Sequence, residues 1–77
     1  MSIEPAQCRA ARALINMNQL ELAHAANLGT ATVKRFEVGL RTLIPNNMKA
    51  VIQALEEAGI EFIARTKTKG PGVRLRE

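Results

Sequence analysis

Residues 19–39, QLELAHAANLGTATVKRFEVG, constrain the fold of this chain more than any other segment. Asn18, just before it, is a favourable helix cap, and Glu21 completes a capping box, so a helix is expected to begin at residue 19. A tight turn follows at residues 27–29, where Asn tolerates a left-handed backbone and Gly serves as the next cap. A second short helix is then expected over residues 30–38.

The second of these helices has two chemically different sides. At about 100° per residue, Val33, Phe36 and Glu37 fall on one side, which we expect to face the core. The opposite side carries Ala31, Arg35 and Val38, and the flanks carry Thr30, Thr32 and Lys34, so the outward surface combines cationic, hydroxyl and short methyl-bearing side chains. Such groups suit DNA, because Arg binds guanine bidentately, Thr touches a thymine methyl and Ala allows close approach. An ordinary solvated helix face is the alternative, but the cap and turn that precede this helix favour groove binding.

The remainder of the chain predicts two further helices. Residues 5–16 form an amphipathic pattern with Pro5 at its first position. A last helix is expected to begin with Asn46 or Asn47 as its cap and to end at Gly59. The free N–H groups at its start, near Asn47, predict a phosphate contact.

From residue 60 the hydrophobic period changes to two, and residues 60–65 and 73–76 read as short strands separated by a polar loop. Three readings stay open: a hairpin within one chain, a sheet shared between two subunits, and a frayed basic tail. We therefore expect a domain at residues 1–64 and, at residues 65–77, a basic C-terminal loop and strand or flexible tail.

The length and charge of the chain favour a small binding module. Seventy-seven residues form one domain that is too small for a deep catalytic cleft. Eleven Lys and Arg exceed seven Asp and Glu, which favours an anionic partner, and the excess lies from Arg41 onward. Arg41, Lys49 and the tail are therefore expected to contact a nucleic-acid backbone.

Several classes of protein are disfavoured. No apolar run approaches the roughly 20 residues needed to span a bilayer, and no signal-peptide pattern is present, so a cytoplasmic location and no membrane partner are expected. Cys8 is the only cysteine and falls on an apolar helix face, which predicts a buried structural thiol. His24 has no ligand partner at helical spacing, so no metal or cofactor is expected.

An enzyme is also not expected. The chain contains no Asp, and no serine or cysteine has a base at a suitable spacing. Glu56 and Glu57 are adjacent, which places them on different faces of their helix.

One set of positions runs through the central segment: Gln19, Leu22, Ala23, Ala26, Leu28, Val33, Phe36, Glu37 and Gly39, followed by Pro45 and an amphipathic helix. This pattern resembles the phage-repressor-type helix-turn-helix proteins of the Cro, lambda-repressor or XRE family. The resemblance implies a mainly α, compact lambda-repressor-like bundle of four or five helices. It also implies sequence-specific binding of double-stranded DNA, usually as a homodimer, and a role in transcription regulation.

The resemblance also implies roles for single residues. It places the residue matching Gln19 on a phosphate, those matching Thr30, Ala31 and Arg35 on bases, and the loop with Arg41 on the backbone. It pairs Arg12 with Glu37 as an ion pair.

Two departures from the family pattern concern the turn and the end of the chain. Asn27 stands where the family usually has glycine, and Gly29 where it usually has Ser or Thr. A strand-like C-terminal segment replaces the fifth helix, so the dimer geometry is not transferable.

The expected function is that of a duplex-DNA-binding transcriptional regulator that reads the major groove with its third helix. The expected base contacts are Thr30, Ala31, Lys34 and Arg35, and the expected phosphate contacts are Gln19, Thr32, Arg41 and Asn47. The alternative is a protein-interaction module with the same fold, such as an antitoxin-like or accessory subunit. In that case Val38 and Leu40 would form an exposed apolar patch.

Overall fold

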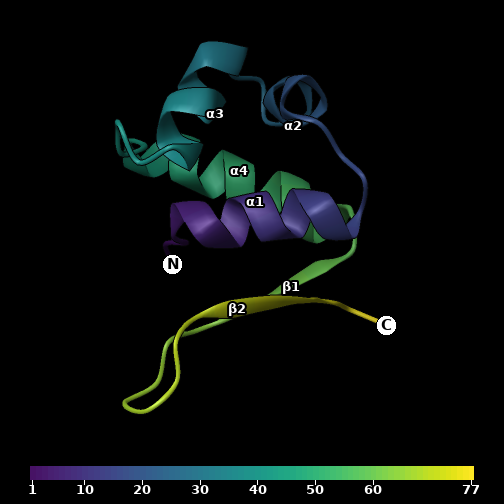
Figure 1. Cartoon of the computed structure of the whole chain (residues 1–77). Helices are drawn as coiled ribbons and strands as arrows, with labels where there is room; N and C mark the ends of the chain where they lie inside the picture. Colours follow the sequence, from purple (N-terminus) through teal and green to yellow (C-terminus); the bar gives the residue numbers. More distant parts are fainter.

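Four helices and one two-stranded antiparallel hairpin make up the chain in a computed structural model, which describes residues 1–77 (Figure 1). In chain order the elements are α1 (Pro5–Leu14), α2 (Gln19–Ala25), α3 (Thr30–Glu37), α4 (Pro45–Glu57), β1 (Ile60–Ile63) and β2 (Gly72–Leu75). Helices α2 and α3 lie at one end of the molecule, α1 and α4 form the middle, and the hairpin lies at the other end (Figure 1). The architecture is therefore mainly α, with four helices and no fifth.

Local side-chain contacts account for where α2 and α3 begin and end. Asn18 Oδ1 accepts a hydrogen bond of 2.7 Å from Glu21 N, and Asn18 N donates to Glu21 Oε1 at 2.9 Å, so the expected capping box is present. Helix α3 ends at Glu37, one residue before the expected end, and Gly39 follows with a φ of 80°. A left-handed glycine at this point reverses the chain direction.

Two expected helix boundaries were wrong. Helix α1 ends at Leu14 instead of residue 16, because Asn16 adopts a left-handed conformation with a φ of 54°. Helix α4 begins at Pro45, with Ile44 as its cap, so neither Asn46 nor Asn47 caps it. Proline is favoured at this first position because its missing N–H would have no partner there.

The C-terminal strands pair with each other within one chain, which is one of the three readings of this segment. The register joins Ile60 with Leu75 and Phe62 with Val73, which places these residues on one face of the hairpin. Gln7 of α1 donates to the Gly72 carbonyl at 3.0 Å and thereby ties the hairpin to the helices. The boundary expected between residues 64 and 65 falls in the hairpin loop, so backbone pairing connects the two segments.

The apolar core lies where the helices and the hairpin meet. It contains fourteen buried residues: Ile3, Cys8, Ala11, Leu22, Ala23, Ala26, Val33, Phe36, Leu43, Val51, Ile52, Ala54, Leu55 and Ile60. Every helix and β1 contribute to it, so each element is held by tertiary contacts in addition to its local signals. None of the helices has the length and apolar character required to traverse a lipid bilayer.

Candidate nucleic-acid interface

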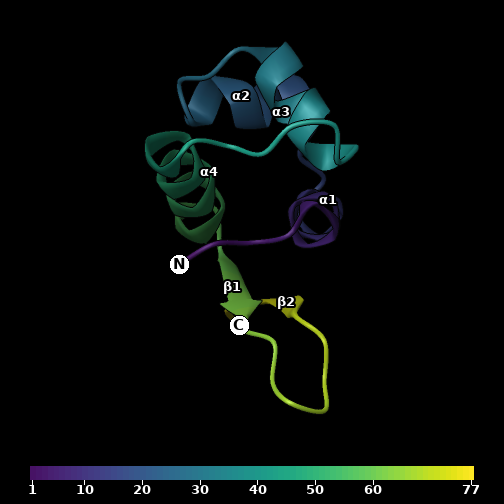
Figure 2. The ribbon, with the colours of Figure 1, turned by 90° about the vertical axis from the view of Figure 1, so that its left-hand side faces the viewer.

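The turn between α2 and α3 is short and hydrogen-bonded. Asn27 takes a left-handed conformation with a φ of 57°, and Leu28 N donates to the Ala23 carbonyl at 2.8 Å. Gly29 is extended and precedes the first residue of α3. The turn therefore accommodates asparagine at residue 27, because Asn enters the left-handed region more readily than most residues. Figure 2 shows α2 and α3 packed together above α1 and α4.

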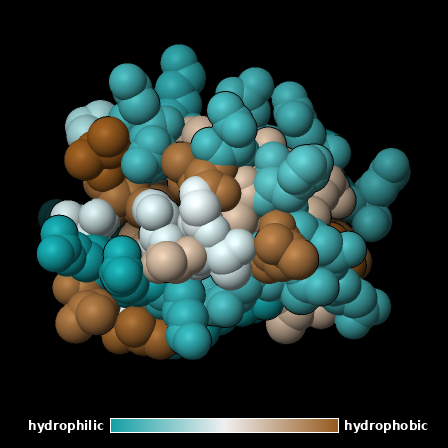
Figure 3. Space-filling model, turned by 90° about the horizontal axis from the view of Figure 1, so that it is seen from above, coloured by the Kyte–Doolittle hydropathy of each residue, from teal (hydrophilic) through white to brown (hydrophobic).

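Helix α3 buries one side and leaves the other free. Val33, Phe36 and Glu37 are buried, as the helical spacing predicted. The side chains of Thr30, Ala31, Lys34 and Arg35 are exposed, and Thr32 is half-buried. The end of the molecule that carries α2 and α3 presents a largely hydrophilic surface (Figure 3).

The buried Glu37 carboxylate holds α3 against two other helices. Arg12 of α1 donates to it through Nε at 2.7 Å and Nη2 at 2.6 Å. Gln19 of α2 donates at 2.9 Å, and the Cys8 thiol of α1 donates at 3.1 Å. The Arg9 guanidinium also donates to the Glu37 carbonyl. This set of donors, which we name the Glu37 cluster, fixes the end of α3 relative to α1 and α2.

The charges of the Glu37 cluster follow from burial and hydrogen bonding. Burial raises the pKa of Glu37, but the hydrogen bonds from Arg12, Gln19 and Cys8 outweigh it, so the pKa lies below its ordinary value. The hydrogen bond to Glu37 raises the pKa of Arg12. Burial raises the pKa of the Cys8 thiol, and the hydrogen bond to Glu37 raises it further. Cys8 is therefore a protonated structural donor at neutral pH.

Gln19, which was expected to contact a phosphate, also has a partner inside the protein. Its side chain is half-buried, and one amide N–H is used by Glu37. The second amide N–H makes no hydrogen bond within the protein. Gln19 therefore links the Glu37 cluster to the start of α2, a role that the sequence did not indicate because Glu37 lies 18 residues away.

The structure brings Arg35, Arg41 and Thr32 together and adds Thr42. These four residues line a hollow of about 210 Å³ at the end of α3, and no apolar side chain lines it. Thr42 was not among the expected contacts; the only signal for it was a hydroxyl next to Arg41 after the glycine turn. Asn47 does not line this hollow, because it lies in the first turn of α4.

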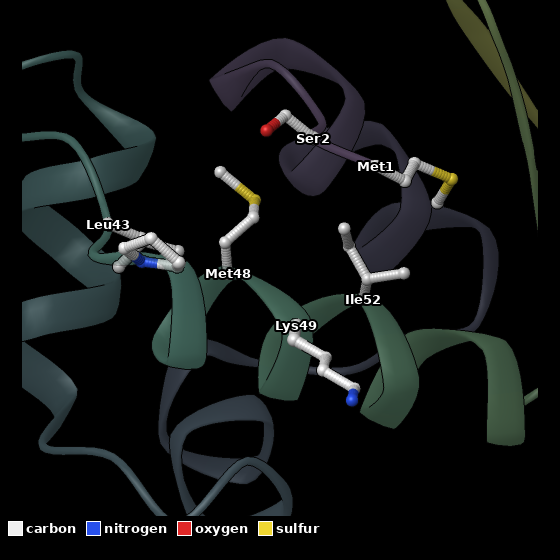
Figure 4. A pocket seen from close by; sticks show the side chains of 7 residues that line it. Met1, Ser2, Leu43, Met48, Lys49 and Ile52 are labelled. Carbon is white, nitrogen blue, oxygen red and sulfur yellow. The ribbon is translucent and has the colours of Figure 1, made fainter.

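Three exposed apolar side chains follow α3 in the chain. Val38, Leu40 and Ile44 are 67%, 71% and 62% exposed. A neighbouring hollow of about 530 Å³ lies between the N-terminal segment and α4, where Met1 and Ser2 face Met48 and Ile52 (Figure 4). Hydrophobic, brown surface is also more extensive on the left of Figure 3, the side on which Figure 1 places the loop between α3 and α4. We name Val38, Leu40 and Ile44 the apolar flank.

No group of three His, Cys, Asp or Glu residues is close enough together to hold a metal ion. His24 lies exposed on α2.

A scan against protein-family models finds no match to this chain, and a search of curated proteins finds none either.

Proposed function

We propose that this protein is a transcriptional regulator that binds double-stranded DNA, in which α2, the turn and α3 act as a helix-turn-helix of the phage-repressor type. One observation carries the proposal. Helix α3 is anchored through Val33, Phe36 and Glu37 and leaves an outward face with only small, hydroxyl or cationic side chains. A short helix with this division fits the major groove, which admits one α-helix.

The proposal assigns the outward face of α3 to the bases. Thr30 and Ala31 lie in the first turn of α3, where a recognition helix contacts base edges, and Lys34 lies one turn further along. Arg35 is exposed and lines the same hollow as Arg41.

The proposed phosphate contacts lie at the margins of that face. The hydrogen-bond donors proposed for these contacts are Arg41, Thr32, the free amide N–H of Gln19 and the N–H groups in the first turn of α4 near Asn47. A net charge of +4 supports attraction to the polyanionic backbone.

The proposed active form is a homodimer in the cytoplasm. Two copies related by a two-fold axis would bind half-sites about one helical turn, or roughly 34 Å, apart.

Selection from random duplex DNA tests the proposal. The expected result is a palindromic consensus with half-sites one helical turn apart. Ala31→Glu places a negative charge on the outward face of α3 and should abolish binding, whereas Ala64→Glu makes the same change at the hairpin and should leave binding intact. Both positions are exposed, so neither change should lower the melting temperature much. The proposal fails if no consensus emerges or if the two variants bind equally well.

The apolar flank favours a second candidate function, that of a protein-interaction module. Isolated exposed leucines are ordinary, but Val38, Leu40 and Ile44 are large, more than half exposed and close in sequence. Failure of the duplex selection, together with loss of self-association in Leu40→Glu by sedimentation velocity, would favour this function.

A further inference from the structure

The hollow at the end of α3 differs from the other hollows of the molecule because none of the residues that line it is hydrophobic. Thr32 and Arg35 come from α3, and Arg41 and Thr42 come from the loop that follows it. Two residues with guanidinium groups and two with hydroxyls therefore line an open hollow of about 210 Å³. One water occupies roughly 30 Å³ of liquid, so the space accommodates a group of several heavy atoms.

The backbone at the end of α3 brings the two arginines together. Gly39, with a φ of 80°, reverses the chain after the helix. Leu40 N and Arg41 N then both donate to the Arg35 carbonyl, at 2.9 and 3.2 Å. The position of Arg41 relative to Arg35 is thus set by two hydrogen bonds and one left-handed residue, and it does not depend on a ligand.

The two guanidinium groups have no partner within the protein. The three ion pairs of the molecule use Arg12, Arg65 and Arg74, and no side-chain hydrogen bond involves Arg35 or Arg41. Glu37, the nearest acidic residue in sequence to both, is buried and occupied by Arg12. Both arginines therefore keep their side-chain N–H donors free, and an anion held by both would satisfy donors of each.

We infer that Arg35 and Arg41, with Thr32 and Thr42, form a clamp for a single phosphate of the DNA backbone. This inference rests on the proposed function and changes the role of one residue within it, because Arg35 then positions α3 and Thr30, Ala31 and Lys34 read the bases. Arginine forks bind phosphate oxygens bidentately, and threonine hydroxyls donate to the remaining oxygens. Phosphate contacts fix the register of a protein on the duplex and carry no sequence information.

A clamp and a base contact respond differently to substitution. If Arg35 holds a phosphate, Arg35→Ala should weaken binding to all duplexes by a similar factor, on the order of 10- to 100-fold. Because both arginines hold the same phosphate, Arg35→Ala and Arg41→Ala should be non-additive in a double-mutant cycle. Lys49→Ala is the matched control: it removes one positive charge outside the hollow and should be additive with Arg35→Ala.

Neutral methylphosphonate linkages, placed one at a time in the selected duplex, locate the contact. One linkage should weaken binding of the parent, and the same linkage should have a clearly smaller effect on both Arg35→Ala and Arg41→Ala. Reduced sensitivity of the two variants at two different linkages would show two separate phosphates and overturn the clamp. If Arg35→Ala instead lost its discrimination at one base pair, the clamp would also be overturned, and Arg35 would again be assigned as a base contact.

Titration with inorganic phosphate at constant ionic strength separates the clamp from the proposed function, because it needs no DNA. In NMR spectra of the parent, the side-chain Nε–Hε signals of Arg35 and Arg41 should shift together and saturate, and in Arg41→Ala the shift of Arg35 should largely disappear. Independent shifts, or none, would overturn the clamp even if duplex DNA binds. If phosphate binds at both arginines but no duplex binds, the two arginines still share one phosphate site, and the proposed function together with the assignment of that site to DNA fails.

Discussion

Replacement of Arg12 by Ala should destabilise the protein strongly, because it leaves the Glu37 carboxylate buried with only two of its donors. The Glu37 side chain is 1% exposed, and its partner Arg12 is 18% exposed. Gln19 and Cys8 remain as donors after the substitution, but both are neutral.

The size of the effect follows from this burial. Breaking a buried ion pair by removing one partner typically lowers the free energy of unfolding by 3–5 kcal/mol, and the partial exposure of Arg12 favours the lower end, about 3 kcal/mol. A domain of this size has a total stability of roughly 4–12 kcal/mol. The melting temperature should accordingly fall by roughly 12–24 °C.

Thermal and urea denaturation followed by circular dichroism measure this change. Arg65→Ala is the matched control, because it breaks the exposed pair with Glu4, whose two side chains are 61% and 51% exposed. That pair should contribute less than about 1 kcal/mol. The double variant Arg12→Ala/Glu37→Gln should recover at least about 1 kcal/mol relative to the sum of the single changes, since no buried charge remains. If Arg12→Ala melted like Arg65→Ala, the argument from burial would be wrong.

Three further predictions concern the same region. Glu37→Gln should make the free energy of unfolding less dependent on pH below about pH 5. The folded-state pKa of Glu37 lies below its ordinary value of 4.5, so its contribution to stability is complete above 4.5 and is lost as pH falls through the folded-state pKa. Urea melts from about pH 5 downward check this, and equal slopes for parent and variant would contradict it. Cys8 is buried, so a thiol reagent should label it only as fast as the protein opens, and rapid stoichiometric labelling of the native protein would contradict this. The free energy of unfolding should also fall as pH rises past 9.0, because the thiol then ionises in the unfolded state and stays protonated in the folded state. Asn18→Ala should lower the free energy of unfolding by about 1 kcal/mol through loss of the α2 cap, and an unchanged urea midpoint would count against that role.

Features that depend on a few consecutive residues were predictable from the sequence. The capping box of Asn18 and Glu21 forms as expected because both partners lie within one helical turn. The buried and exposed sides of α3 follow from the helical period alone. The boundaries at Asn16 and Pro45 were missed because helix ends respond to individual backbone conformations, which the hydrophobic pattern does not encode.

The sequence by itself therefore determined the helices, the turn between α2 and α3 and the outward face of α3, since these depend on local propensity and periodicity. Only the tertiary structure decided that Gln19 donates to Glu37 and that the C-terminal strands pair within one chain against Gln7. It also decided that Arg35 and Arg41 share one hollow, although they lie on different elements. These arrangements join residues that are separated along the chain or by a reversal of its direction, so packing and loop closure select them and no local pattern specifies them.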